Sequence, residues 1–173
     1  MHDQATIPTR PGTLAEVVRR VRDEGEALHF CLAGFLDEFY AERVPAVRRA
    51  RLESEPGLIG DERRDALIGA IGEHLCHRWE LGEPPRWTHN PARFLAHPWF
   101  MGPERMKAFL LAESPGAFRR RFIFTEAEPL RRMSMPKDGR WWAYETMRTG
   151  IVPEPGDIEP VDDVRPEASM QAK

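Results

Sequence analysis

Prolines at expected helix starts punctuate the stretch from Asn90 to Phe124, which reads NPARFLAHPWFMGPERMKAFLLAESPGAFRRRFIF. Each of three prolines follows a residue that suits a helix N-cap, in the pairs Asn90-Pro91, Gly102-Pro103 and Ser114-Pro115. Proline fits the first helical position because its missing N–H would have no intrahelical partner there. This punctuation predicts a stack of short helices over residues 91–96, 103–113 and 115–121.

Apolar residues that recur every three or four positions indicate four further helices. The expected ranges are 13–25, 26–43, 46–53 and 61–79. Thr13 and Glu16 have the spacing of a capping box, and Asp61 is a suitable N-cap for the fourth helix. These signals place well-defined starts on two of the four helices.

The fold class that follows is all-α, an irregular bundle of about six to eight short-to-medium helices. A second capping box, Thr125 with Glu128, predicts one or two further turns that end near Met133. Phe122 to Phe124 is a β-favourable triplet but is too short to predict a strand. The residues predicted to form the core are Phe35, Leu36, Phe39, Leu67, Ile71, Leu75, Phe109, Leu110 and Phe118.

Three regions are expected along the chain. Residues 1–12 contain two prolines and no periodic pattern, so they are predicted to form a flexible arm. Residues 13–133 are predicted to be a single helical domain. Residues 134–173 begin with an aromatic cluster (Trp141, Trp142 and Tyr144) and continue as a proline-rich acidic segment, which predicts a mostly disordered acidic C-terminal tail.

Charge and composition restrict the functional classes. The net charge of −3 comes from the tail, because basic and acidic residues are equal in number up to residue 133. A neutral body argues against a large nonspecific nucleic-acid surface. Cys31 and Cys76 lie in apolar helical patterns, as expected of buried free thiols in a reducing compartment. Without a signal-peptide pattern or a membrane-spanning stretch, we expect a cytoplasmic protein that does not bind membranes.

The sequence offers weak candidates for metal binding and catalysis. His74 and His77 share one helical face, but zinc needs two more ligands, and neither a CxxC nor an HExxH motif accompanies them. The repeated Glu-x-x-His pairs of di-iron bundles are also missing. Ser114 follows a predicted helix and precedes a proline, so it is interpreted as an N-cap and not as a nucleophile. We therefore expect no metal, no cofactor and no catalytic residue.

Two groups of residues are candidates for contact with a partner. Arg119, Arg120 and Arg121 carry dense positive charge that could contact phosphates or an acidic protein surface. Alternatively, these arginines pair with Glu113, Glu126 or Glu128 and hold the helical corners together. The second group is Trp87, Trp99 and Phe100, which lie in proline-bounded loops and either form an exposed groove or wrap the core.

Four segments of the chain resemble an uncharacterised family of small all-helical bacterial proteins. They are FLDEFY at Phe35–Tyr40, EHL at Glu73–Leu75, RFLAHPWF at Arg93–Phe100 and LAESPGAFRRR at Leu111–Arg121. Similar proteins are encoded beside nucleotidyltransferase-like proteins, in an arrangement suggestive of toxin and antitoxin. The resemblance covers about the central hundred residues, brings no catalytic residues, and implies only a partner-binding role.

The function expected from these features is non-enzymatic binding of a partner protein, in a regulatory or antitoxin-like role. The product of a neighbouring gene is the candidate partner. A DNA-binding transcriptional regulator is the alternative, although the second predicted helix is apolar and acidic where a recognition helix would be basic. An uncharacterised enzyme is the third interpretation, and it lacks a clustered nucleophile, base and oxyanion donor.

Overall fold

The computed structural model describes residues 9–160, and these divide into two compact units. Unit 1 extends to Met135 and unit 2 begins at Pro136. The described residues contain seven α-helices and one two-stranded parallel sheet, so the predicted all-α class is confirmed. None of the described helices has both the length and the apolar character needed to cross a membrane.

The first four helices of unit 1 lie where the apolar periodicity predicted them. They are α1 (Leu14–Asp23), α2 (Leu28–Ala41), α3 (Pro45–Glu53) and α4 (Glu62–Arg78). Thr13 caps α1 by accepting a hydrogen bond from the backbone N–H of Glu16 at 3.1 Å. Asp61 caps α4 by accepting one from the N–H of Arg64 at 2.9 Å. Local capping signals therefore fix where both helices begin.

The proline-punctuated stretch folds into short helical turns and two short strands. In chain order these are η1 (Arg86–His89), η2 (Pro91–Arg93), β1 (Trp99–Phe100), η3 (Glu104–Met106), α5 (Lys107–Glu113), α6 (Gly116–Arg119) and β2 (Ile123–Phe124). The strands pair in parallel, with Trp99 opposite Ile123 and Phe100 opposite Phe124. The triplet Phe122 to Phe124, which was too short to predict a strand, contains β2, because β1 lies beside it and pairs with it.

Two details of this stretch correct the sequence analysis. The Ser114 hydroxyl does not cap α6: it accepts a hydrogen bond from the Thr125 N–H at 2.7 Å and lies 2.6 Å from the Leu110 carbonyl oxygen, which joins α5 to the chain after β2. The capping box at Thr125 and Glu128 starts no helix in residues 125–133. Glu128 is buried and accepts a hydrogen bond from Arg78 at 2.9 Å, so its carboxylate serves a contact with α4 instead.

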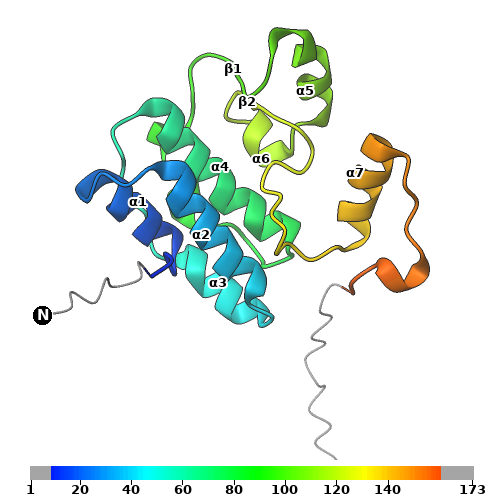
Figure 1. Cartoon of the computed structure of the whole chain (residues 1–173). Helices are drawn as coiled ribbons and strands as arrows, with labels where there is room; N and C mark the ends of the chain where they lie inside the picture. Colours follow the sequence, from blue (N-terminus) through cyan, green and yellow to red (C-terminus); the bar gives the residue numbers. More distant parts are fainter. Residues whose placement is uncertain (1–8, 161–173) are drawn as a thin grey trace, which may run out of the picture. The chain divides into compact units, whose positions relative to one another are not determined.

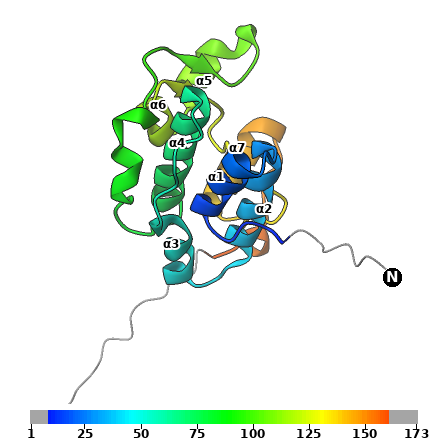
Figure 2. The same cartoon turned by 90° about the vertical axis from the view of Figure 1, so that its left-hand side faces the viewer.

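Helix α4 is the central element of unit 1. In Figures 1 and 2 it runs between helices α1–α3 on one side and the segment from η1 to β2 on the other. Among the predicted core residues, those that are buried are Phe35, Leu36, Phe39, Ile71, Leu75, Leu110 and Phe118. Phe109 is 46% exposed, so its assignment to the core is wrong. Leu110 is the residue that α5 buries, and consecutive helical residues point about 100° apart.

A buried ion pair joins α4 to the chain after α6. Arg121 is fully buried and donates to the Glu73 carboxylate at 2.7 Å, to the Thr88 carbonyl and to the Ala117 carbonyl. Burial lowers the pKa of the Arg121 guanidinium from its ordinary value, and the pair with Glu73 opposes that shift. Because the charge is matched and hydrogen-bonded on several sides, α6 is held in a fixed position on α4.

Two glycines let neighbouring segments approach α4 closely. A Cβ atom at Gly72 would lie 2.3 Å from the Trp87 ring, which is itself held by a hydrogen bond from Nε1 to the Leu52 carbonyl. A Cβ at Gly69 would lie 2.9 Å from the Arg93 side chain and 3.0 Å from Nε of Arg121. The absence of side chains at these positions is therefore a packing requirement.

Residues 9–12 belonged to the predicted arm, but they contact α1. Arg20 donates a hydrogen bond to the Thr9 carbonyl at 2.6 Å, and the Gly12 N–H donates to the Glu16 carboxylate at 2.8 Å. The rest of that predicted arm, residues 1–8, lies outside the described residues. Arg20 and Glu16 of α1 thus hold the residues that lead into the helix.

Unit 2 contains helix α7 (Gly139–Thr149) and a turn, η4 (Pro155–Asp157), in a region that was predicted to be mostly disordered tail. The Asp138 side chain caps α7 by accepting from the Trp141 N–H at 2.9 Å, and Gly150 ends it with φ of 76°. The Trp142 indole donates to the Asp157 carbonyl at 3.0 Å. The sequence analysis overlooked these two signals for a helix, an acidic N-cap at Asp138 and a glycine C-cap at Gly150. The acidic residues after 160 lie outside the described residues.

The close contact between Gly72 and Trp87 gives a stability test. Replacing Gly72 with Ala should lower the free energy of unfolding by about 1–3 kcal/mol, the usual cost of overpacking a core. Gly116→Ala is the control, since a Cβ at this helical position would have no atom within 4 Å. Chemical denaturation checks both, and equal stabilities would contradict the packing described here.

Candidate partner-binding groove

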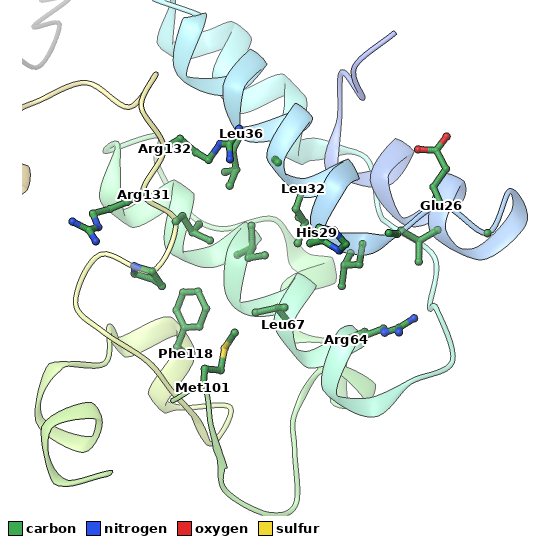
Figure 3. A pocket seen from close by; sticks show the side chains of 18 residues that line it. Glu26, His29, Leu32, Leu36, Arg64, Leu67, Met101, Phe118, Arg131 and Arg132 are labelled. Carbon is green, nitrogen blue, oxygen red and sulfur yellow. The ribbon is translucent and has the colours of Figure 1, made fainter. Parts of the chain in front are cut away.

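Helices α2 and α4 enclose an open space in unit 1. Near their C-terminal ends the two helices are in contact, because the rings of Tyr40 and Trp79 lie 5.7 Å apart. Towards their N-terminal ends a cavity of about 750 Å³ lies between them. We call this cavity the α2–α4 groove, and Figure 3 shows the side chains that line it. Its volume is in the range of protein binding sites.

Apolar side chains from both helices form the walls of the groove. On α2, Leu28, Leu32 and Leu36 follow each other at intervals of four residues, and on α4, Leu67 and Ile71 have the same spacing. Figure 3 shows Leu32 and Leu36 pointing into the space from one side, with Met101 and Phe118 opposite. Residues four apart lie on one face of a helix, so each wall is a straight apolar row.

The chain from Pro129 to Arg132 forms a third wall, and α2 holds it in place. The Tyr40 hydroxyl donates to the Leu130 carbonyl at 2.9 Å. The Asp37 carboxylate accepts two hydrogen bonds from Arg132, at 2.7 and 3.0 Å, and one from the Ser134 hydroxyl at 2.7 Å. These bonds from Arg132, together with the one from Ser134, hold the pKa of Asp37 below its ordinary value. Hydrogen bonds within the fold therefore fix the position of this wall.

Charged residues stand at the ends of the groove. Figure 3 shows Arg131 and Arg132 at one end and Arg64 with Glu26 at the other. Glu26 lies 4.0 Å from Arg20 and accepts a hydrogen bond from the Cys31 thiol at 3.1 Å. Burial, with Glu26 beside it, raises the pKa of Cys31 to about 11, so this thiol stays protonated near neutral pH.

Arg64 differs from the other charged residues at the groove. It is exposed, and its side chain forms no ion pair with any residue between 9 and 160. By contrast, Arg132 is bound to Asp37 and Glu26 lies beside Arg20. An exposed cation next to an apolar surface can therefore interact with an acidic group that approaches the groove.

The arginines predicted to bind a partner are largely used within the fold. Arg121 is buried, which corrects its assignment to a partner-binding surface. Arg120 is 41% exposed and lies 3.2 Å from the same Glu73 carboxylate, while Arg119 donates to the carbonyls of Ala112 and Ser114. The alternative, that these arginines hold the corner together, is correct for Arg121. The acidic partner is Glu73, not Glu113, Glu126 or Glu128.

The predicted aromatic surface is also divided. Trp87 is buried against α4 and stacks on Arg93, so it packs on the core. Trp99 and Phe100 are half-buried on β1. The Phe100 ring stacks on Phe124 at 4.9 Å, and Lys107 lies over it. None of these residues lines the groove.

The two histidines considered as metal ligands have different surroundings. His74 is buried and packs edge-on against the Phe118 ring at 5.5 Å. His77 is exposed. Among the residues that the structure describes, no group of three or more His, Cys, Asp or Glu side chains could hold a metal ion.

The groove itself was not predicted from the sequence. Of the residues that line it, Leu36, Leu67, Ile71 and Phe118 were assigned to the core, and Leu67 is only half-buried. Comparisons with protein-family models, curated proteins and solved structures give no significant match to this chain.

The wall formed by Arg132 gives a pH-dependent prediction. In the folded chain the pKa of Asp37 lies below its ordinary value of 3.8. The interactions of the ionised carboxylate therefore stabilise the fold fully above pH 3.8, and this stabilisation is lost as the pH falls through the lower pKa of the folded chain. Wild type should exceed Asp37→Asn in unfolding free energy by up to about 1 kcal/mol near neutral pH, a small value because Arg132 is exposed. The difference should shrink in denaturation experiments as the pH falls below 3.8 towards the lowered pKa of the folded chain. A difference that is the same at every pH would contradict it.

Proposed function

We propose that this protein binds a partner protein in the α2–α4 groove. The observation that carries the proposal is the pair of apolar rows on α2 and α4, which face a shared space that no helix of the described chain fills. Such a space between two helices suits a helical segment of another protein, which would bury its apolar face there. The burial of apolar surface would drive association.

The arrangement of the third wall supports binding by a preformed site. Tyr40 and Asp37 both hold the chain of residues 130–134 against α2. A partner would therefore not have to order this wall on binding, and preorganisation of this kind favours affinity.

A protein partner also agrees better with the arginines than DNA does. The run at Arg119–Arg121 would be the phosphate-binding feature of a DNA-binding regulator, but Arg121 is buried and Arg120 contacts Glu73. Nonspecific DNA binding requires cations that are free to contact phosphates. The proposal therefore places recognition on the apolar groove.

The role proposed for this binding is regulatory or antitoxin-like. The resemblance to small helical bacterial proteins supports it, and it makes the product of a neighbouring gene the first partner to test. In this role the chain would contribute a surface and no chemistry of its own.

The test is co-expression of the full chain with the neighbouring gene product, followed by calorimetric measurement of the Kd. Leu32→Glu should weaken the complex at least about tenfold, because it places an unpaired charge in an apolar contact. Phe30→Glu is a matched control on the same helix, since Phe30 is 73% exposed and does not line the groove. Equal Kd values for wild type and a folded Leu32→Glu variant would refute the proposal.

A further inference from the structure

We infer that the segment bound in the groove is an amphipathic helix of two to three turns with acidic residues at the end that meets Arg64. This inference rests on the proposed function and adds the length, polarity and direction of the bound segment. It draws on the dimensions of the apolar rows and on the charges at the two ends of the groove.

The length follows from the apolar row on α2. Leu28 and Leu36 are its first and last members, eight residues apart, which corresponds to about 12 Å along a helix, or slightly more than two turns. A bound helix that follows this row would contact it with about three apolar residues at intervals of three or four. A longer segment would extend beyond the apolar walls into solvent.

The charge expected on the bound helix follows from the charged residues at the two ends of the groove. At one end, Arg64 is exposed on the first turn of α4 and forms no ion pair with residues 9–160. Glu26, at the same end, accepts a hydrogen bond from Cys31 and lies 4.0 Å from Arg20, whose nearest carboxylate is that of Glu16 at 2.5 Å. Figure 3 shows the Glu26 carboxylate pointing away from the groove. At the opposite end, Arg132 makes two hydrogen bonds to Asp37, and Arg131 is half-buried and interacts with another group of the described chain. An incoming carboxylate is therefore attracted most strongly to the Arg64 end.

Direction and specificity are the consequences of this asymmetry. Both rows consist of leucine or isoleucine along their whole length. An apolar helix without charges could therefore bind in the groove in either direction. Glutamates at one end would favour the orientation that brings them to Arg64, and lysines at that end would be repelled. The apolar rows supply affinity, and Arg64 supplies the choice of direction and partner.

The experiment uses the full chain and two synthetic helical peptides of about twelve residues, long enough for three turns. Both carry the same apolar row, and one has two glutamates where the other has two lysines, at the same terminus. Fluorescence anisotropy measures both Kd values. We expect the acidic peptide to bind about fivefold or more tightly than the basic one, with the preference shrinking at high salt.

Variants identify the site of the preference. Arg64→Glu should reverse the preference between the peptides, and Leu32→Glu should weaken both. Arg63→Glu is the matched control: Arg63 is the preceding exposed residue of α4, lies over Trp99 and does not line the groove, so the preference should remain. Circular dichroism confirms that each variant is folded.

Several outcomes would overturn the inference. Equal binding of the two peptides, or a preference that survives Arg64→Glu, would exclude recognition of acidic residues by Arg64. Failure of both peptides, with Arg64-dependent binding of dodecanoate, would identify the occupant as a small amphiphilic carboxylate. If both peptides fail while Leu32→Glu still disrupts the complex with the partner protein, the proposed function stands and the acidic helix is wrong. If that complex is also insensitive to Leu32→Glu, the proposed function itself fails.

Discussion

The carboxylate of Glu73 is the interaction on which the second half of unit 1 depends. It is 2% exposed on α4 and receives Arg121 from the chain that follows α6, with Arg120 beside it. Removing one member of such a buried pair leaves an uncompensated charge and typically costs about 3–5 kcal/mol. Because Arg121 also donates to the Thr88 carbonyl, the same group places η1 and the start of β2 relative to α4. The position of Phe118 in the groove follows from this anchoring.

The groove exists because α2 and α4 are in contact at one end only. The Tyr40–Trp79 contact and the Tyr40–Leu130 hydrogen bond close the C-terminal end, whereas the leucines of the α2 row face α4 across an open space. An apolar surface of this kind costs free energy when it is left in water. A folded protein that retains it, with one wall fixed by hydrogen bonds, has a surface suited to association.

The sequence predicted those parts of the fold that depend on local chemistry. Helix starts at Thr13 and Asp61, and the apolar faces of α1 to α4, follow from capping and periodicity alone. The errors arise where a distant residue decides the outcome. Glu128 was expected to cap a helix and instead binds Arg78, fifty residues away. For Arg121 the sequence left partner contact and pairing within the fold both open, and the structure buries it against Glu73, which was not among the expected acidic partners. The groove could not be predicted, because an apolar row on a helix looks the same whether it meets another helix or a space.

The close packing at Gly69 has a consequence for how this sequence can change over evolutionary time. A side chain at position 69 would collide with Arg93 and with Nε of Arg121, so the glycine and the two arginines occupy a single shared volume. A larger residue at position 69 would force the backbone or one of these arginines to move, and the loss of Arg121 would leave Glu73 with only the exposed Arg120. Positions 69, 73, 93 and 121 should therefore vary together among homologous sequences, whereas the leucines of the groove are not tied to this set.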